Sequence, residues 1–456
     1  MTQMRKIETT DLIEATPAPR PPQRRVLLLQ GHPSRFWRDL GDGLKASGAT
    51  VFKVHLCLAD RVFWHRRGGQ SYRGRFSDWP AWLESFIKAQ GITDILYYAD
   101  RFPYHVAARA VADRLGIAAW VIEFGYLRPD WITFEPGGMN AYSTFDRHPD
   151  ALTARAAQAQ EPDLVTRYAH PFRTEAVNEV LFGLLAVFGR PLYPRYRSDL
   201  IYWPVLDYLS WIPKLLLSAR ADRRARQIED RLVSESAAYF LLPMQIEADY
   251  QIRDNSPYAS LEDFVNEVIC RFAHHAAPEA RLVIKLHPLD SGLENWAARC
   301  RRMARAWGLS HRIDILRGGD LATLLKHAQG VVLVNSTVGL HALRLRVPVM
   351  VCGAAIYDIP GLTHQGSMAS FFTAPDPVSP DLLSIFLRAL STLQVKGSFF
   401  SPEGRRAAIA EIVARLQPAA LSDQVISASR QRWRTNMAAP TVNRLAPTSK
   451  GNEIVT

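Results

Sequence analysis

Short apolar runs alternate with amphipathic stretches along the first third of the chain. Buried strands are predicted from the apolar runs at 26–30, 50–56, 92–100 and 118–123. Helical patterns lie between them, through Leu44 and over 79–90 and 104–115. Strands that alternate with helices are typical of a doubly wound parallel sheet, whose functional side chains lie just past the strand ends. Such positions are occupied by Gln30, Asp100 and Glu123.

The same alternation returns after residue 236. Strands are predicted at 237–245, 280–288, 330–336 and 347–353, and helices at 261–276 and 321–329. The segment between the two alternating sets is helical, aromatic and basic. We therefore predict an α/β, GT-B-like fold, in which two Rossmann-like domains and a helical bridging region enclose an active-site cleft.

The pattern divides the chain into five parts. They are a polar tail, an acceptor-side domain, the helical region, a donor-side domain and a second polar tail, at 1–24, 25–175, 176–235, 236–430 and 431–456. Both tails are expected to be disordered, and the first lacks the apolar core of a signal peptide. The apolar stretch 200–217 is interrupted by Asp207, Lys214 and two prolines, so we expect no membrane-spanning helix.

Charge and cysteine content narrow the possible partners. The 456 residues carry a formal charge of +11, which favours an acidic partner such as an anionic lipid or a phosphorylated substrate. The basic residues are mixed with aromatic and acidic ones rather than gathered in blocks, which argues against nucleic acid. Four scattered cysteines without a CxxC pair indicate neither zinc nor disulfides, and this composition fits a reducing cytoplasm.

Two strand ends in the second set have the chemistry of a phosphate site. VIKLHP brings Lys285 and His287 to the end of one strand, with Pro288 fixing the backbone beside them. VNST places Asn335, Ser336 and Thr337 between another strand and a helix. Each has an ordinary structural explanation, a solvated strand end in the first case and a helix cap in the second. Together they favour a nucleotide phosphate, because free N–H groups at a helix start also bind anions.

A third strand end carries Gln245 and, four residues later, Asp249. A carboxylate at this place is a candidate nucleophile or base. The alternative is an aspartate that begins the next helix.

Four residues of the first domain are predicted to line the opposite wall of the cleft. Asp100 and Glu123 are candidate acid or base groups, and Arg128 is a candidate anion contact. His105 lies in an alanine-rich helix, where a packed or capping histidine is the alternative.

Several motifs of nucleotide and metal enzymes are missing from the sequence. It has no GxxxxGKS, GxGxxG, HExxH or GxSxG, and no DxD pair to hold a metal. We therefore expect no metal and no cofactor. A CMP-sugar fits such a site, because CMP leaves as a monophosphate that Lys285, His287 and helix N–H groups can receive.

The order and spacing of seven segments resemble the capsular polysaccharide biosynthesis/export family, and in particular its KpsS-type β-Kdo transferases. These segments are LLLQGHPSRFWRDL, YYADRFPYHVAARAVA, EFGYLRPDWITFEPGGMNAYS, MQIEADYQIRDNSPYASLEDFVNEV, VIKLHPLDSG, VNSTVGLHAL and GAAIYDIPGLTHQG. They run from about residue 26 to about residue 366.

The resemblance implies transfer of Kdo from CMP-β-Kdo to a lyso-phosphatidylglycerol acceptor, with retention of the β-configuration, to begin the oligo-Kdo linker of the capsule. It assigns CMP binding to Lys285, His287, Pro288, Asn335 and Ser336, and the nucleophile segment to Gln245 and Asp249. It also implies work on the cytoplasmic face of the inner membrane of a Gram-negative bacterium, beside other capsule enzymes and the exporter.

The sequence departs from the family pattern at two places. Two acids commonly precede Gly-Tyr-Leu-Arg-Pro, whereas here Glu123 is followed by Phe124. The family's Gly-Asp-Cys-Arg-Pro reads Ala99-Asp100-Arg101-Phe102-Pro103. Both changes put a charge expected in the cleft in doubt.

The expected mechanism is a double displacement. Asp249 attacks the anomeric carbon as CMP leaves, and the acceptor hydroxyl then attacks while Glu123, or alternatively Asp100, accepts its proton. The region around Trp203, Tyr208 and Trp211, with the arginines after it, suits either a membrane surface or packing between the domains. The competing functions are a non-catalytic export adaptor that binds lipid or glycan, and an interaction scaffold.

Overall fold

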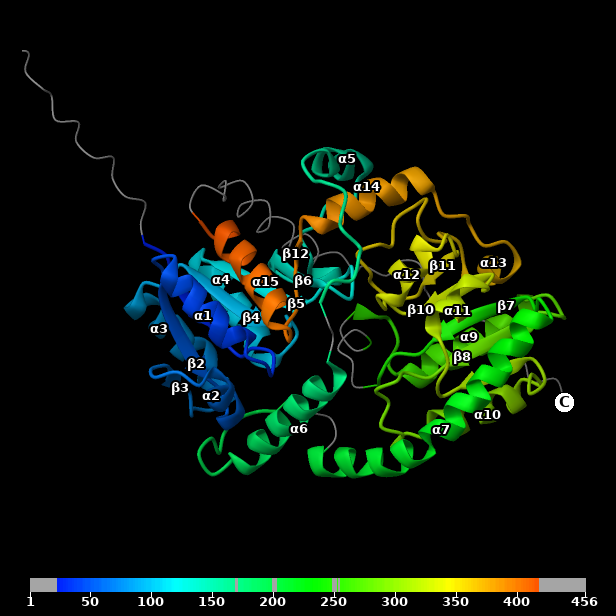
Figure 1. Cartoon of the computed structure of the whole chain (residues 1–456), viewed down its shortest axis with the longest axis horizontal. Coiled ribbons are helices and arrows are strands. Elements are labelled where there is room, and N and C mark those ends of the chain that lie inside the picture. The colour runs from blue at the N-terminus through cyan, green and yellow to red at the C-terminus, as the bar shows by residue number, and fades with distance from the viewer. Residues whose placement is uncertain (1–22, 169–170, 199–202, 248–251, 253–254, 418–456) are drawn as a thin grey trace, which may run out of the picture.

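The computed structural model describes residues 23–168, 171–198, 203–247, 252 and 255–417. Within these residues the strands form two sheets, one of seven strands and one of five. Figure 1 shows the two sheets as separate α/β units, with α6 and α7 along one edge of the pair. The predicted GT-B-like architecture is therefore confirmed: two Rossmann-like units and a helical bridging region.

The first sheet has the strand order β12-β6-β5-β4-β1-β2-β3. These strands are β1 (Arg25–Leu28), β2 (Thr50–His55), β3 (Gln70–Ser71), β4 (Asp94–Tyr98), β5 (Ala118–Phe124), β6 (Trp131–Pro136) and β12 (Gln394–Lys396). Its helices are α1 (Phe36–Ala46), α2 (Leu58–Trp64), α3 (Trp79–Gln90), α4 (Pro103–Leu115) and α5 (Pro149–Ala157), with short 3-10 turns at Phe76–Asp78 and Asn140–Tyr142. Local sequence sets the ends of α3, because Pro80 lies in its first turn and Gly91 ends it with a left-handed φ of 58°.

The prediction of a purely parallel first sheet is wrong at one edge. β5 and β6 are antiparallel, with Glu123 opposite Thr133, and β12 is antiparallel to β6. The chain turns back directly after β5 because Gly125 lets the backbone of Trp131 approach; a Cβ there would lie 2.5 Å from the Trp131 carbonyl oxygen.

The second sheet is parallel throughout, in the order β11-β10-β7-β8-β9. Its strands are β7 (Tyr239–Pro243), β8 (Arg281–Lys285), β9 (Ile313–Leu316), β10 (Gly330–Leu333) and β11 (Val349–Val351). The helices of this unit are α9 (Leu261–His275), α10 (Trp296–Ala306), α11 (Leu321–Lys326), α12 (Val338–Arg344) and α13 (Met368–Thr373). The side chain of Ser260 caps α9 by accepting a hydrogen bond from the Asp263 N–H.

The sequence predicts a donor-side domain that continues to residue 430, but in the structure the chain leaves the second unit earlier. After α14 (Pro380–Ser391) the chain returns to the first sheet as β12, and α15 (Pro402–Arg415) then packs against α1. An ion pair of 2.9 Å between Arg405 and Asp39 joins these two helices. A strand of three residues has too little periodicity to be recognised, and its partner strand lies more than 250 residues earlier.

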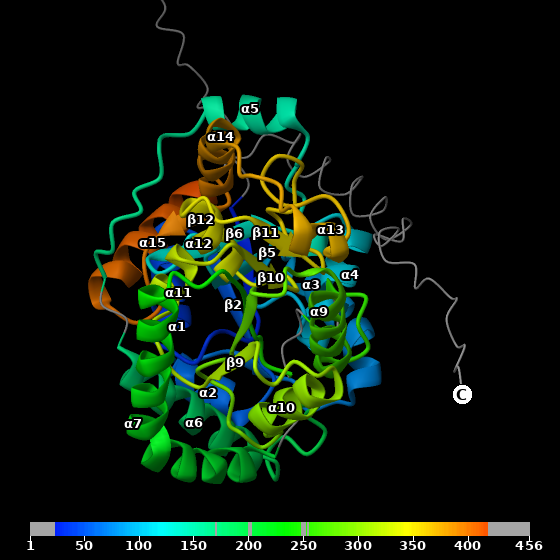
Figure 2. The same cartoon turned by 90° about the vertical axis from the view of Figure 1, so that its right-hand side faces the viewer.

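The bridging region consists of α6 (Phe172–Phe188) and α7 (Pro204–Ser234). α6 lies against α2 of the first unit, and α7 reaches the second unit, where Arg231 pairs with Asp314 at 2.8 Å. Figure 2 shows the two helices together at one border of the molecule. Across the residues with described positions, no helix combines the length and apolar character needed to cross a membrane.

Candidate functional site

Lys285 ends β8 with its side chain buried. Its ammonium group donates a hydrogen bond of 2.9 Å to the carbonyl oxygen of Gly318, and burial lowers its pKa, opposed mainly by the charge of Glu229 on α7. Lys285, which the sequence predicts to bind phosphate, is therefore already hydrogen-bonded to the loop at Gly318 and near the acidic Glu229 of the bridging helix.

His287 lies half-buried just beyond β8. Its Nδ1 accepts the Leu289 N–H at 3.0 Å, which leaves Nε2 as the protonated nitrogen of the neutral ring. Burial, together with the charges of Lys214, Arg128 and Lys285, lowers its pKa to about 4. At neutral pH His287 is thus an uncharged hydrogen-bond donor. The following Pro288 is exposed, and its carbonyl oxygen accepts a hydrogen bond from Lys214.

Gln245 and Asn335, which lie beyond the adjacent strands β7 and β10, are brought into direct contact. The Gln245 amide donates to Asn335 Oδ1 at 3.1 Å and accepts the Asn335 N–H at 3.3 Å. Both side chains are buried, so this exchange fixes the turn that precedes α12.

At the start of α12 the two hydroxyl residues differ. Ser336 Oγ accepts the Val338 N–H at 3.2 Å, whereas Thr337 occupies the cap position without a side-chain cap. Asp249, four residues after Gln245, lies outside the described residues, and its predicted role stays a prediction.

Glu123, on the facing unit, has the properties of an acid or base. Its carboxylate accepts the Phe124 N–H at 3.0 Å and a hydrogen bond from the Tyr98 hydroxyl. Burial nevertheless raises its pKa to about 7, although these bonds and Arg128 act in the opposite direction. The carboxyl can therefore exchange a proton near neutral pH.

Asp100 and His105 serve the local backbone. Asp100 is buried and accepts the Met139 N–H at 2.9 Å, which holds the loop after β6. His105 is fully buried, stacks on Tyr97 at 5.0 Å and lies 2.9 Å from the carbonyl oxygen of Ala99. Burial lowers the His105 pKa to about 4, so this residue is a packed neutral histidine.

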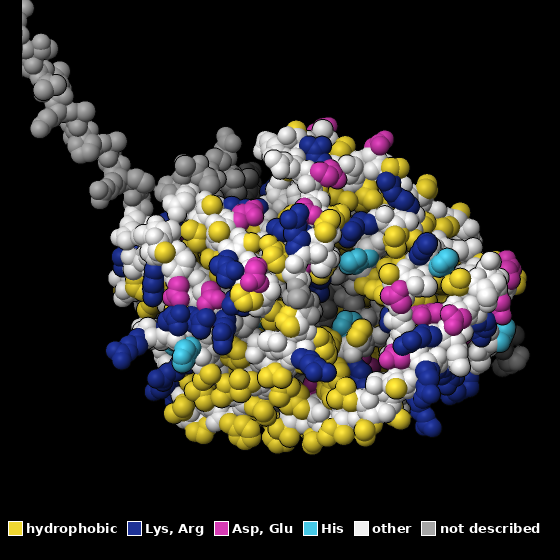
Figure 3. All heavy atoms as spheres, in the orientation of Figure 1, with side chains coloured by type: hydrophobic (Ala, Val, Ile, Leu, Met, Phe, Trp, Pro, Cys, Tyr) yellow, Lys and Arg dark blue, Asp and Glu magenta, His cyan; other side chains and the backbone are white. Residues whose placement is uncertain are grey.

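Arg128 is exposed, with its guanidinium 5.1 Å from the centre of the Phe124 ring. Its charge lowers the pKa values of both His287 and His341, which belong to the other unit. Arg128 therefore faces these two histidines across the gap, and Figure 3 shows the surface hollowed between the units. The sequence analysis did not single out His341, although it lies within the segment VNSTVGLHAL.

Phe124, which stands where the family has a second acid, belongs to an aromatic cluster. The cluster is built around His32, whose ring stacks on Phe399 at 4.7 Å and meets Phe124 edge-on at 5.2 Å. Phe399 follows β12, so residues from both ends of the chain close this wall. The substitution of an acid by Phe124 is thus matched by apolar neighbours.

Glu179 on α6 also reaches this wall and was missed by the sequence analysis. Its Oε1 lies 3.9 Å from His32 Nε2. No sequence motif marks it, because only the packing of α6 on the first unit brings it there.

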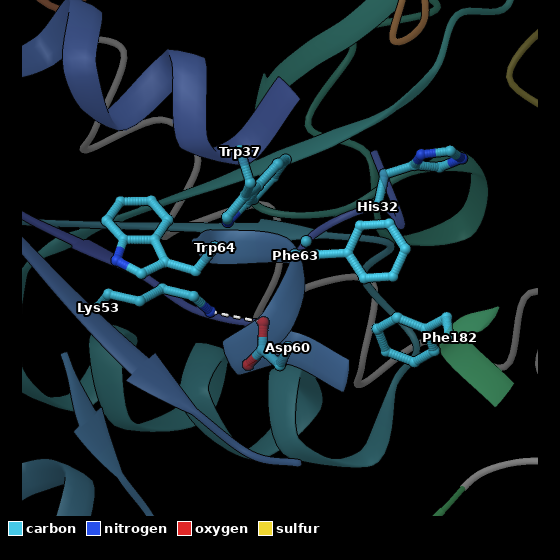
Figure 4. A pocket seen from close by; sticks show the side chains of 8 residues that line it. His32, Trp37, Lys53, Asp60, Phe63, Trp64 and Phe182 are labelled. Atoms are coloured by element: carbon cyan, nitrogen blue, oxygen red, sulfur yellow. Dashed lines mark hydrogen bonds and ion pairs between the residues drawn. The ribbon is translucent and has the colours of Figure 1, made fainter. Parts of the chain in front are cut away.

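A small hollow, with a cavity volume of about 10 Å³, lies beside His32 (Figure 4). It is lined by Gly31, His32, Trp37, Lys53, Asp60, Phe63, Trp64 and Phe182. At one wall the buried Lys53 and Asp60 form an ion pair of 2.7 Å. Lys53 also donates to the carbonyl oxygens of Leu29 and Val54, so its ammonium group has three hydrogen-bond acceptors within the protein. Among the residues with described positions, no group of three or more His, Cys, Asp or Glu side chains is arranged to hold a metal ion.

Comparison with known proteins assigns the chain to a family. The model of the family described as "Capsule polysaccharide biosynthesis protein" matches residues 93–400. The chain belongs to this family. One relative is the "Capsule polysaccharide export protein KpsS" of Escherichia coli. It is 32% identical to this chain over 82% of this chain and 95% of the relative.

Two further similarities concern Neisseria and a solved structure. The "Capsule polysaccharide modification protein LipB" of Neisseria meningitidis serogroup B is 29% identical over 82% of this chain and 91% of the relative. A solved structure, "Thermosulfurimonas dismutans KpsC, beta Kdo 2,7 transferase", is 15% identical with a TM-score of 0.41, covering 87% of this chain and 100% of that one.

The buried ion pair predicts a large stability effect. Replacing Asp60 with Ala leaves the Lys53 ammonium without its counter-charge, which should lower the free energy of unfolding by about 3–5 kcal/mol. The exposed pair of Arg66 and Asp42, also 2.7 Å apart, provides the control, since Asp42→Ala should change little. Urea denaturation of both variants measures the difference, and equal effects would contradict the prediction.

The raised pKa of Glu123 predicts a pH-dependent stability. Its proton is held more tightly in the folded state, so the stability it contributes is complete below the unfolded pKa of 4.5 and is lost as the pH rises through about 7. The native protein should therefore lose stability between pH 5 and pH 8, whereas Glu123→Gln should not. The difference in the free energy of unfolding between the variant and the native protein should shift in favour of Glu123→Gln at pH 8. Denaturation midpoints at the two pH values test this, and a parallel shift of both proteins would refute it.

Proposed function

We propose that this protein is a retaining glycosyltransferase that moves β-Kdo from CMP-β-Kdo to a lyso-phosphatidylglycerol acceptor and so starts the oligo-Kdo linker of a capsule polysaccharide. The observation that carries the proposal is the pairing of a titratable Glu123 on one unit with hydrogen-bond donors on the other, across a hollow that Arg128 also faces. Membership of the capsule polysaccharide family supports the substrate class.

The donor-binding wall is rich in positive charge and N–H groups. Arg128 supplies a fixed cation, and His287 supplies a neutral donor opposite it. Ser336 and the N–H groups at the start of α12 complete the set that would receive the CMP phosphate and the carboxylate of Kdo. Lys285 would contribute its positive charge, and Asn335 holds the turn before α12. Thr337 and Pro288 would border the site. CMP carries one phosphate, so the proposal requires no metal or cofactor.

The proposed chemistry has two displacements. Asp249 attacks the anomeric carbon, the bond to the CMP phosphate oxygen breaks, and its electron pair leaves with CMP. The acceptor hydroxyl then loses its proton to Glu123 and forms the new glycosidic bond, while the bond to Asp249 breaks and restores the carboxylate. Glu123 suits the base role, because burial raises its pKa to about 7 and the carboxyl can exchange a proton near neutral pH.

A membrane surface fits the bridging helices. α6 and α7 expose a belt of large apolar side chains, seen along one edge of Figure 3. Its most exposed members are Phe172, Val177, Phe188, Trp203, Leu206, Leu209, Ile212, Leu215, Leu216 and Leu217. The exposed Arg220, Arg223, Arg224 and Arg226 follow on α7, where anionic headgroups would meet them. We place the protein on the cytoplasmic face of the inner membrane, beside other capsule enzymes and the exporter.

One observation favours a second function, that of a non-catalytic export adaptor. Phe124 replaces an acid of the family pattern and is packed among aromatic rings, so one charge of the cleft is absent at that position. The name of the Escherichia coli relative also refers to export. An adaptor would bind lipid or glycan but never cleave CMP-Kdo.

Replacing the proposed nucleophile separates binding from turnover. Asp249→Asn should lower transfer at least about 10³-fold and leave CMP affinity within about threefold of native, because the amide cannot form the glycosyl ester. The exposed Asp381→Asn is the matched control and should retain native transfer. Activity is measured as CMP release and CMP affinity by calorimetry. Undiminished transfer by Asp249→Asn would exclude Asp249 as nucleophile, and a native protein that never releases CMP would favour the adaptor.

The apolar belt predicts vesicle binding. Leu216 is 79% exposed, and burial of a leucine side chain contributes about 1.5–3 kcal/mol, so Leu216→Glu should weaken binding to phosphatidylglycerol vesicles at least about tenfold. Val165 is 66% exposed away from α6 and α7, and Val165→Glu should bind as the native protein does. Co-sedimentation with phosphatidylglycerol and phosphatidylcholine vesicles measures both. Equal binding to the two lipids, or no effect of Leu216→Glu, would contradict a membrane role.

A further inference from the structure

Lys214 lies on the side of α7 that contacts the loop after β8. It is half-buried and comes three residues after Trp211, so both side chains project from the same side of the helix. Its ammonium nitrogen is 4.0 Å from the centre of the Trp211 ring. The next two residues, Leu215 and Leu216, are exposed and belong to the apolar belt. At this turn α7 thus presents apolar side chains outward and a cation to the second unit.

The ammonium group of Lys214 is bonded to the backbone of residues 287–290, which we call the donor turn. It donates hydrogen bonds to the carbonyl oxygen of Pro288 and, at 2.7 Å, to that of Asp290. The donor turn is closed by the Asp290 N–H, which donates to the carbonyl oxygen of His287 at 3.0 Å. A single side chain from the bridging helix therefore holds two of the four residues of the turn.

The donor turn also fixes the orientation of the His287 ring. Leu289 lies between the two residues that Lys214 holds, and its N–H donates to His287 Nδ1 at 3.0 Å. Because Nδ1 is the acceptor, the proton of the neutral ring is on Nε2, the nitrogen that can donate to a phosphate. A loosened turn would lose this hydrogen bond, and the ring could then rotate and change tautomer. The geometry of a proposed phosphate ligand thus depends on a lysine of another element.

The charge of Lys214 favours the same state of His287. Burial lowers the pKa of His287 to about 4, and the charge of Lys214 is the next largest cause, ahead of Arg128 and Lys285. A neutral ring can accept the Leu289 N–H and donate from Nε2. A protonated ring is a donor at both nitrogens, so it could not accept that N–H. Lys214 therefore keeps the ring in the one state that the donor turn accommodates.

We propose that Lys214 is a positioning residue for the sugar donor: it holds the donor turn from the bridging helix, so that His287 Nε2 is presented to the phosphate of CMP. This inference rests on the proposed function and specifies how its donor site is held in place. Lys214 does not touch the donor in this assignment and takes no part in bond making or breaking. It acts through the donor turn and the His287 ring.

Several charged groups surround Lys214 and His287 and stay unchanged when Lys214 is replaced. They are Asp207 of α7, Asp290 of the donor turn, Arg317 after β9, Lys285 of β8 and Arg128 of the first unit. Removal of the Lys214 charge should raise the pKa of His287 above its native value of about 4. Because burial, Lys285 and Arg128 remain, this pKa should stay below the ordinary value of 6.5.

Two substitutions of Lys214 separate positioning from packing. Met keeps the apolar stem but donates no hydrogen bond, so Lys214→Met should weaken CMP binding about tenfold, because the bond from His287 to the phosphate is no longer aligned. Arg keeps the charge and can donate to two carbonyl oxygens, so Lys214→Arg should stay within about threefold of native. Lys326→Met, at an exposed lysine of α11, is the matched control and should bind as native. Calorimetry measures CMP affinity, and urea denaturation shows that each variant is folded.

The state of His287 is followed without any ligand, by NMR of protein labelled with ¹⁵N at histidine. The native ring should be neutral at pH 7 with its proton on Nε2, and it should titrate well below pH 6.5. In Lys214→Met the titration should move to higher pH, and both tautomers should be populated at pH 7. His287→Gln identifies the signals. A lysine that served packing alone would lower the urea midpoint without either change.

The two measurements distinguish this inference from the proposed function. If the native protein binds no CMP while His287 changes as described, the role of Lys214 in holding His287 is supported and the transferase proposal alone fails. If the native protein binds CMP, unchanged affinity in Lys214→Met overturns the positioning role. An unchanged His287 ring in Lys214→Met overturns it in either case.

Discussion

The antiparallel pairing of β12 with β6 is the contact on which the geometry of the cleft depends. β12 brings the chain back from the second unit, so it fastens the two units together at the edge of the first sheet. The buried Gln394 accepts the Leu127 N–H at 3.0 Å, one residue before Arg128. Arg415 in turn donates to the carbonyl oxygens of Thr392 and Gln394, which locks β12 to α15. The loop that faces the donor wall is thereby fixed by a strand from the other end of the chain.

The same return closes the acceptor side. Phe399 and Phe400 come directly after β12 and pack around His32, with ring centres 4.7 and 5.2 Å away. His32 lies beside Glu179 of α6, and Phe124 fills the remaining side. This wall is built from four separate segments and is largely apolar. Within such a wall the few carboxyl groups hold their protons to near neutral pH, which is the property that acid–base chemistry requires.

Opposite charges divide the space between the units. The second unit and Arg128 present cations and N–H donors, whereas the wall around Glu123 and Glu179 is acidic. A phosphate is attracted to the first side and a hydroxyl group to the second. In the proposed function, this division would orient a phosphorylated donor and a hydroxyl acceptor. In the same proposal it would separate the leaving group from the base, because the phosphate and the proton would leave toward different walls.

Much of the fold followed from local pattern. The predicted helix at 79–90 coincides with α3, and the strands near 26, 50, 94 and 118 are present because each is a buried apolar run between turn residues. The contact between Gln245 and Asn335 agrees with the expectation that neighbouring strand ends converge. Residues brought in by tertiary packing were not predictable in this way. β12 is too short to leave a pattern, and Glu179 resembles any polar residue of an amphipathic helix.

The sequence also left two acids of the first unit interchangeable, and only the structure separates their surroundings. Asp100 is bound by the Met139 N–H, whereas Glu123 has a pKa of about 7. Which hydrogen bonds a carboxylate accepts depends on loops that sequence pattern does not position. The structural reason for Phe124 could not be predicted either, since its partners Phe399 and Phe400 lie more than 270 residues later.

The central claim is transfer of a single β-Kdo to a lysolipid, and the product tests it most directly. Purified protein, CMP-Kdo supplied by an in situ generating system, and lyso-phosphatidylglycerol would be incubated, and the lipid analysed by mass spectrometry and NMR. The account predicts a lipid heavier by one Kdo residue, joined in the β-configuration. A lipid that remains unmodified while the protein binds CMP, or a product joined in the α-configuration, would contradict it.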